Sequence, residues 1–370
     1  MALCLALGTW VLTACNDDND ENTTGSTTMD ETLVKVTFDG STATVDIPSN
    51  LKSEVTATVD GAYVEINNNN TSEELEFTLS GESDNGGFTY NGQYKTTFNL
   101  NGLTLASQRG GAIDIQCGKR IAMILEEGTT NTLSDYAQGT QKACLNCKGH
   151  LEMKGSGTLN VTGNLNHAIK TKEYLELKKS VGSINILDAA GDAIHAGQYY
   201  LQSGGTVSIT STTKGDGIQV ESLTLDDDIT SDPDEENNGQ IIIKDGVINI
   251  EMANEDCKAI KCDSLITISG GTFTITASGK GSRGIQTDKD MVIGEENATT
   301  TINIAATGGL CTNEDHEDDP HRCMGIKVDG NLTVNAGTIT VTNTGTKSRG
   351  IKVGGIYTKN GGTVNANVKN

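Results

Sequence analysis

Nine copies of one short pattern recur along this chain at close to a fixed spacing. Most copies lie 24 or 25 residues apart, and the two longest steps contain insertions at 226–239 and 308–323. A repeat of about 20 to 50 residues is typical of a solenoid, in which each unit stacks on the next. Each copy centres on an aliphatic residue, usually preceded by Gly or Ala: Ile115, Leu145, Ile169, Ile194, Ile218, Ile260, Ile285, Ile326 and Ile351.

Each repeat contains two or three short β segments and almost no helical pattern. The segments are rich in Thr, Ile and Val, which favour pleated strands, and the chain has 44 Gly but only 3 Pro. Aromatic residues make up only 4% of the chain, as expected for a narrow interior filled by stacked aliphatic side chains. The sequence therefore predicts an all-β fold, a parallel β-helix with like residues stacked in columns.

The first residues predict where the protein is located. Residues 1–15 are apolar and end in Leu-Thr-Ala-Cys, which resembles a bacterial lipobox in which Cys15 becomes the lipidated N-terminus. An ordinary signal peptide or a short membrane anchor is the alternative, although the segment is too short to span a bilayer well. The acidic run that follows resembles the export signal of surface lipoproteins. We therefore expect an outer-membrane lipoprotein exposed at the cell surface.

Four segments follow from these patterns. Residues 1–15 form a lipoprotein signal peptide, and residues 16–32 form an acidic, disordered tether. Residues 33–100 are β-like but irregular, and we expect them to form an N-terminal β cap and the first irregular coils, because the open end of a solenoid must be covered. Residues 101–370 form the β-helix itself, and the expected state is a monomer.

The residue after each key aliphatic residue points outward, because side chains alternate along a strand. This outward column is rich in cations, although the chain has a net charge of −22. A line of cations at coil spacing suits a polyanion such as a polyuronate, and solubilising lysines are the alternative. The column consists of Lys170, His195, Gln219, Lys261, Gln286, Lys327 and Lys352.

Tyr174 and Tyr199 share a further column on neighbouring turns. They form either a small stacking platform for sugars or a simple ladder of side chains.

Acidic residues also form columns. Asp192 and Asp216 stand two residues before their key isoleucines, and Asp188 and Asp256 lie near the same turn. Carboxylates stacked about 4.8 Å apart repel each other unless a cation intervenes, and Ca²⁺ accepts about six to eight oxygen ligands. These four residues are therefore candidate Ca²⁺ ligands, with hydrogen-bonded turn residues as the alternative. A second candidate column comprises Glu221, Asp263, Asp288 and Asp329.

The cysteines leave several pairings open. Cys117 and Cys147 fall in one inward column on neighbouring turns, where they form either a disulfide or two buried free thiols. Cys311 and Cys323 flank an insertion that they are placed to staple. Cys257 and Cys323 should not pair, because two coil steps of roughly 9.6 Å exceed disulfide reach.

Segments between about Phe77 and Val353 resemble a family of bacterial, calcium-binding, carbohydrate-binding β-helices, related in fold to pectate lyases of the family-9 type. The resemblance implies a single-stranded, right-handed parallel β-helix that binds plant-type polysaccharide, including cellulose and pectic material. It also implies calcium held at GDGI-type turns, which Asp192 and Asp216 match. The matching segments are FTLSG, FNLNGLTL, GGAIDIQ, IAMILEEGTTNTLSD, LEMKGSGTLNVTGNLNHAIKT, AAGDAIHAG, GGTVSIT and KGDGIQV.

Three functions compete at this point. The first is surface-anchored, non-catalytic, calcium-dependent binding of an acidic, pectin-like or cellulose-like polysaccharide. The second is a polysaccharide lyase acting on polyuronate, which needs calcium and a basic residue such as Lys170 or Lys261. The third is a structural adhesin. No phosphate-binding loop, Ser–His–Asp pattern or nucleic-acid patch is visible, so no nucleic-acid partner is expected.

Overall fold

The computed structural model describes residues 32–223, 237–312 and 320–369. The expected lipidation residue Cys15 and nearly all of the expected tether lie outside these ranges. Within them the secondary-structure elements are β-strands joined by turns, apart from one 3-10 turn, η1 (Ser49–Leu51). No helix in this part of the chain is long and apolar enough to cross a membrane.

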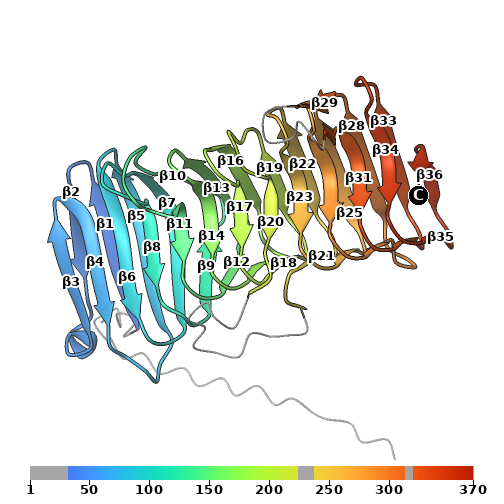
Figure 1. The fold of residues 1–370 in the computed structure, drawn as a ribbon. Helices are drawn as coiled ribbons and strands as arrows, with labels where there is room; N and C mark the ends of the chain where they lie inside the picture. The colour runs from blue at the N-terminus through green and yellow to red at the C-terminus, as the bar shows by residue number, and fades with distance from the viewer. Residues whose placement is uncertain (1–31, 224–236, 313–319, 370) are drawn as a thin grey trace, which may run out of the picture.

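One sheet contains thirteen strands whose spatial order follows the chain (Figure 1). All its pairings are parallel except that between its first two strands, which form an antiparallel hairpin. Its strands are β3 (Val55–Asp60), β4 (Ala62–Asn68), β6 (Gly86–Gly92), β8 (Ile113–Gln116), β11 (Ala143–Cys147), β14 (His167–Thr171), β17 (Ile194–Ala196), β20 (Ile218–Val220), β23 (Lys258–Cys262), β26 (Arg283–Thr287), β31 (Met324–Val328), β34 (Arg349–Val353) and β37 (Val368–Lys369).

The other large sheet has twenty-two strands, most of them in two parallel ladders. One ladder contains β9 (Ile121–Leu125), β12 (Leu151–Lys154), β15 (Leu175–Leu177), β18 (Tyr199–Gln202), β21 (Gln240–Ile243), β24 (Ile266–Ile268), β27 (Met291–Ile293), β32 (Leu332–Val334) and β35 (Tyr357–Lys359). The second contains β10 (Thr130–Ser134), β13 (Thr158–Gly163), β16 (Ser183–Ala189), β19 (Thr206–Ile209), β22 (Val247–Met252), β25 (Gly271–Ala277), β28 (Thr300–Ala306), β33 (Thr338–Asn343) and β36 (Thr363–Asn365).

Long strands join the two ladders at the N-terminal end. Strand β7 (Thr96–Ala106) pairs with both β9 and β10, and it also pairs with β5 (Leu75–Ser83). Strand β1 (Leu33–Asp39) continues this end in parallel with β5 and forms an antiparallel hairpin with β2 (Thr42–Asp46). Residues 33–100 therefore contain two antiparallel hairpins and two turns of long strands, which makes this segment irregular.

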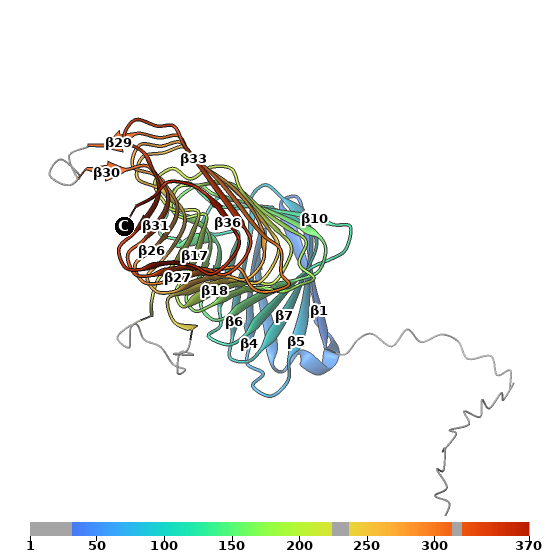
Figure 2. The same cartoon turned by 90° about the vertical axis from the view of Figure 1, so that its right-hand side faces the viewer.

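From β8 onward, each turn of the chain contributes one strand to the thirteen-stranded sheet and one to each ladder. Figure 2, which looks along the stack, shows the turns lying one behind another. This arrangement is consistent with the predicted parallel β-helix, and the right-handed sense of the coil stays a prediction. A short hairpin of β29 (Leu310–Cys311) and β30 (His321–Arg322) rises from the second insertion.

The predicted column of key aliphatic residues is present with one correction. Its members from Leu145 to Ile351 pair in one continuous register and are buried. The first predicted member, Ile115, was wrong by two residues. Leu145 pairs with Ile113, whereas Ile115 pairs with Cys147. A slip of two residues keeps a side chain on the same face, so both isoleucines point inward.

The core is continuous along the whole stack. Aliphatic side chains fill most turns, but the N-terminal turns also contain packed rings of Phe77, Phe88, Tyr90 and Phe98, with centroids 5.0–5.7 Å apart. Such edge-on and tilted contacts stabilise aromatic clusters beyond simple burial of area. The scarce aromatic residues are therefore concentrated where the coils are least regular.

All seven cysteines in the described ranges are buried and unpaired. Cys117 does not share a register position with Cys147, because Ile115 occupies that place. Cys257 and Cys323 directly precede Lys258 and Met324, which both pair with Arg283 on the turn between them. The two cysteines therefore lie two turns apart, as predicted. The chain therefore relies on its core rather than on cross-links.

We expect these seven thiols to resist alkylation in the native protein and to react after unfolding without any reductant. Burial raises the pKa of Cys147 to about 12, so the reactive thiolate is scarce in the folded state. Differential alkylation followed by peptide mass spectrometry measures this directly. A linked peptide joining Cys311 to Cys323, or labelling of most thiols in the native protein, would contradict the prediction.

Candidate functional site

The outer face of the thirteen-stranded sheet carries the predicted outward column. Residues from Lys170 to Lys352 pair in one register, turn after turn. The same column continues toward the N-terminus through Asn146, Asp114 and Thr89. The strand alternation read from the sequence therefore places one polar column along the stack.

A groove of about 950 Å³ lies over the N-terminal half of this face. The groove begins at β3 and β4 and ends at the residues that follow β20. From β4 to β20 the sheet advances by six strands. At about 4.8 Å a step, the groove's length is about 29 Å. The groove therefore crosses the strands, and it is long enough for an extended chain molecule.

Basic, acidic and amide side chains line the groove, and its carboxylates are those of Asp60, Glu65, Asp114 and Glu221. Four lysines, Lys142, Lys148, Lys170 and Lys172, belong to its lining. Lys170 makes no ion pair with any residue in the described ranges, and burial lowers its pKa. Neutral donors and acceptors lie between the cations, including Gln116, Gln141 and Asn146.

One end of the groove contains an aromatic ring with a cation above it. The guanidinium of Arg109 lies 4.1 Å from the centre of the Tyr63 ring and also pairs with Asp60 at 2.5 Å. This contact orders the Arg109 side chain beside the groove. Neither Tyr63 nor Arg109 lies in a repeated motif, so repeat-based reasoning did not find them.

The predicted ligand-binding cations divide into two groups. Lys170 and His195 line the groove, whereas Lys261, Lys327 and Lys352 continue the column beyond it. Two of the latter have acidic neighbours, since Lys327 Nζ lies 2.6 Å from Asp329 and Lys261 Nζ lies 3.9 Å from Asp216. The positive charge of the column is therefore least compensated at Lys170 and Lys352.

The two tyrosines of the predicted platform stack on each other. The rings of Tyr174 and Tyr199 lie 4.6 Å apart and within 16° of parallel. The ring of His150 covers Tyr174 from the preceding turn at 4.3 Å, and Tyr199 is buried. The rings cover one another's faces in a ladder, and neither tyrosine lines the groove.

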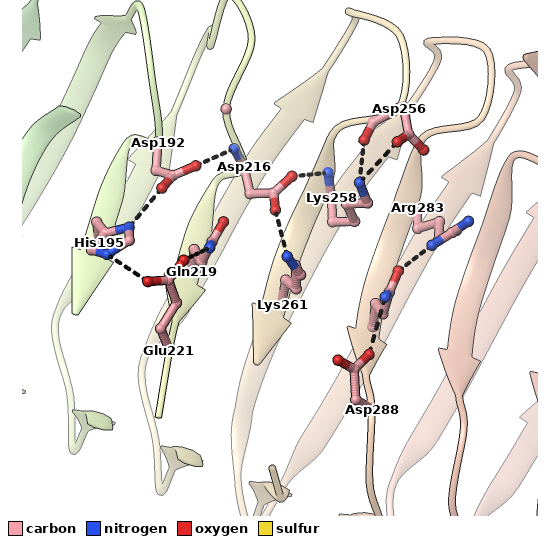
Figure 3. Close-up of polar contacts among 12 residues, drawn as sticks. Asp192, His195, Asp216, Gln219, Glu221, Asp256, Lys258, Lys261, Arg283 and Asp288 are labelled. Atoms are coloured by element: carbon pink, nitrogen blue, oxygen red, sulfur yellow. Dashed lines mark hydrogen bonds and ion pairs between the residues drawn. The ribbon is translucent and has the colours of Figure 1, made fainter. Parts of the chain in front are cut away.

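Asp192 and Asp216 bind the backbone of the next turn (Figure 3). The amide of Asp216 donates to Asp192 Oδ1 at 2.7 Å, and the amide of Lys258 donates to Asp216 Oδ1 at 2.7 Å. The remaining oxygen of Asp192 lies 2.7 Å from His195 Nδ1 and 3.3 Å from His167 Nδ1. Each carboxylate therefore links its own turn to the one that follows.

The same environment shifts the pKa values of these groups in opposite directions. Burial opposes ionisation of Asp192, but the neighbouring imidazoles of His167 and His195 hold the pKa of this carboxyl well below its usual range. Burial raises the pKa of Asp216 to about 6, although the nearby Lys258 opposes that rise. Burial also lowers the pKa of His167.

The other predicted calcium ligands do not join this pair. Asp188 is exposed on β16 of the other large sheet, and Asp256 contacts His321 Nδ1 at 2.7 Å and Lys258 Nζ at 3.2 Å.

In the described ranges, one group of three His, Cys, Asp or Glu residues has ligand atoms within 4.8 Å of one another: His167, Asp192 and His195. His167 was missed, although it occupies the repeat position of Asp192 and Asp216, two residues before the key isoleucine.

The second acidic column lies on successive turns at the ends of the strands. Glu221 accepts a hydrogen bond from Gln219 at 2.6 Å, and Asp263 accepts one from the amide of Ser222 at 3.0 Å. Asp288 is exposed, and its carboxylate lies 3.4 Å from the Gln286 amide. This column therefore presents carboxylate oxygens to solvent.

Comparison with solved structures shows a similar fold in a polysaccharide lyase-like protein from C. thermocellum, described as a gadolinium derivative. The two have a TM-score of 0.57 and 20% sequence identity, and the match covers 73% of this chain and 99% of that chain. Comparison with curated proteins gave no match. Residues 60–369 match the model of a family described as carbohydrate-binding domain-containing protein, and the chain therefore belongs to this family of carbohydrate-binding proteins.

Proposed function

We propose that this chain binds an acidic, pectin-like polysaccharide in its groove without cleaving it. The observation that carries the proposal is the groove itself, which crosses the strands and has four lysines in its lining, in a chain with a net charge of −22. Membership of a carbohydrate-binding family supports polysaccharide as the ligand class. A neutral, cellulose-like glycan is the alternative ligand that the experiment below distinguishes.

The distribution of charge favours an extended polyanion. The groove lysines lie on two neighbouring turns about 4.8 Å apart, with Lys142 and Lys148 flanking β11 and Lys170 and Lys172 at β14, so a polymer that crosses the strands would meet two pairs of amino groups. A polyuronate carries one carboxylate on each sugar, and neighbouring carboxylates complement these two pairs of amino groups. The amides of Gln116, Gln141 and Asn146 add hydrogen-bonding groups for sugar hydroxyls.

A polysaccharide lyase is the second candidate, and one observation favours it. Burial lowers the pKa of Lys170 within the groove, which is the direction of shift that favours a lysine general base, although Glu221 and Asp192 oppose it. Binding without cleavage is preferred because both oxygens of the neighbouring Asp192 already accept contacts from protein nitrogens. Asp192 therefore has no free oxygen to hold the calcium ion that a lyase needs to neutralise the uronate carboxylate.

Calcium, the cofactor expected from the sequence, is proposed at the second acidic column, where Glu221, Asp288 and Asp329 are exposed, although Asp329 also contacts Lys327 Nζ at 2.6 Å. Ca²⁺ requires about six to eight oxygen ligands, whereas Asp192 faces two imidazole nitrogens and Asp216 faces lysine. Exposed carboxylates of the second column have oxygen ligands available. We propose that neighbouring carboxylates of this column, drawn from Glu221, Asp263, Asp288 and Asp329, would hold calcium with water as the remaining ligands, and that the ion would supply positive charge for uronate carboxylates there.

Reversing the charge of two exposed groove lysines tests the binding function. We expect Lys142→Glu with Lys148→Glu to weaken binding to polygalacturonate by about tenfold or more, because two attractions become repulsions. Wild-type binding should also weaken as salt rises, since exposed charges are screened over about 8–10 Å. Affinity electrophoresis and titration calorimetry measure both effects.

The matched control carries Lys179→Glu with Lys359→Glu, which makes the same charge change at exposed positions outside the groove. Equal affinity in the groove double variant and this control would remove the groove from the proposal. Binding to cellulose instead of polygalacturonate would support the neutral ligand. New ultraviolet absorbance from unsaturated uronate, lost in Lys170→Ala, would establish the lyase function.

Calcium dependence is tested at the exposed acidic column. We expect millimolar Ca²⁺ to strengthen binding to polygalacturonate and Asp288→Asn with Asp329→Asn to abolish that gain, because the carboxylate ligands are removed. Asp188→Asn is the matched control, since Asp188 is an exposed carboxylate on the other large sheet. Affinity that does not change with calcium would argue against the calcium part of the proposal.

We further propose that Cys15 carries the lipid that anchors the protein to the outer membrane, facing outward. The lipobox-like residues before Cys15 support this. We expect the wild-type protein to be labelled with a fatty-acid analogue and to be cleaved by protease added to intact cells. Cys15→Ser should abolish the labelling and leave the protein unprocessed or released from the membrane. Equal labelling of the two proteins would rule out this anchor.

A further inference from the structure

Three metal-ligating side chains converge on the outer face of two neighbouring turns. His167 belongs to β14, and Asp192 and His195 belong to the next turn, in which β17 pairs with β14 so that Ile194 lies opposite Ile169. Asp192 Oδ2 lies 2.7 Å from His195 Nδ1 and 3.3 Å from His167 Nδ1. The two imidazole rings lie 4.5 Å apart.

The hydrogen-bonding capacity of His195 does not match its surroundings. Both ring nitrogens face carboxylate oxygens, with Nδ1 2.7 Å from Asp192 and Nε2 3.6 Å from Glu221 (Figure 3). A neutral imidazole has one N–H, so it can donate to only one of the two carboxylates. The side chain of His195 is 7% exposed, which leaves little room for water to compensate. Either a second ring proton or a bound cation must therefore lie between one of the two nitrogens and its carboxylate.

His167 presents the same mismatch at a single atom. Its Nδ1 accepts a hydrogen bond from the amide of Asp192 at 3.1 Å and lies 3.3 Å from a carboxylate oxygen of the same residue. A nitrogen that accepts from an amide has no proton to donate to a carboxylate. With both imidazoles protonated on Nε2, the two Nδ1 atoms and the Asp192 oxygen face one another, and a cation bound there would take the place of the hydrogen bond from the Asp192 amide to His167 and relieve their repulsion.

We propose that His167, Asp192 and His195 bind a divalent transition-metal ion, with Zn²⁺ as the probe. Imidazole nitrogen and carboxylate oxygen are preferred ligands of such ions, whereas Ca²⁺ is held by oxygen. Three protein ligands leave a coordination position for water, as in open zinc sites. Glu221 faces the other nitrogen of His195, the position of the outer carboxylate that orients a metal-bound histidine. This site does not depend on polysaccharide binding.

The first test measures Zn²⁺ binding by the mature chain, free of any tag and stripped with EDTA, in calorimetric and thermal-shift titrations without glycan. We expect a high-affinity Zn²⁺ event that raises the melting temperature and that the same concentration of Ca²⁺ does not reproduce. His167→Gln and Asp192→Asn should each weaken this event at least tenfold. Asp192→Asn keeps an oxygen that can accept from the amide of Asp216.

The control is His150→Gln, since His150 also contacts a carboxylate, that of Glu173, but lies outside the cluster. Unchanged Zn²⁺ affinity in His167→Gln, or an equal loss in His150→Gln, would overturn the proposal. So would a wild-type protein that binds Ca²⁺ but not Zn²⁺ through these residues.

A second measurement uses only the wild-type protein and does not depend on whether variants fold. Crystals grown with Zn²⁺ and recorded at the zinc absorption edge should show an anomalous peak at about 2.0–2.2 Å from the two Nδ1 atoms and the Asp192 carboxylate. No peak at the cluster, or peaks only elsewhere, would show that protons alone occupy the space between these groups.

Discussion

Parallel hydrogen bonding between successive turns determines where every other side chain in this protein lies. Because each strand pairs in register with the strand one turn earlier, residues at equivalent repeat positions stack directly on one another. Inward positions become continuous apolar columns, and outward positions become continuous polar columns. An elongated core and a patterned outer face are thus consequences of the same register.

The aspartates of the GDAI and GDGI segments illustrate how polar columns add to this register. The amide of each following turn donates to the carboxylate before it, from Asp216 to Asp192 and from Lys258 to Asp216. Buried carboxylates that accept backbone amides satisfy donors that would otherwise be costly to bury. A repeat pattern that resembles a calcium motif therefore also supplies hydrogen bonds between neighbouring turns in this chain.

The repeat spacing was enough to predict the β-rich fold, the inward column and the outward cations, because each follows from strand alternation. It misplaced the first key residue, since Ile113 and Ile115 point to the same side and differ only by a two-residue slip. The groove could not be predicted, because Tyr63 and Arg109 come from irregular segments outside the repeat. The contact of Asp192 with His167 depends on side-chain conformations across two turns, which spacing alone does not fix.

Charge placement gives this acidic protein two distinct polar surfaces on one sheet. Four lysines gather in the groove on the turns of β11 and β14, whereas two column lysines farther along, Lys261 and Lys327, lie beside Asp216 and Asp329. A polyanion should therefore contact the N-terminal half of the face first.

A crystal structure of the protein with an oligogalacturonate of several sugars would locate the ligand. The proposed function predicts sugar density along the groove, across the strands from β8 to β17, with uronate carboxylates near Lys142 and Lys170. Density confined to the two ladders of the other sheet, or an empty groove at saturating ligand, would contradict it.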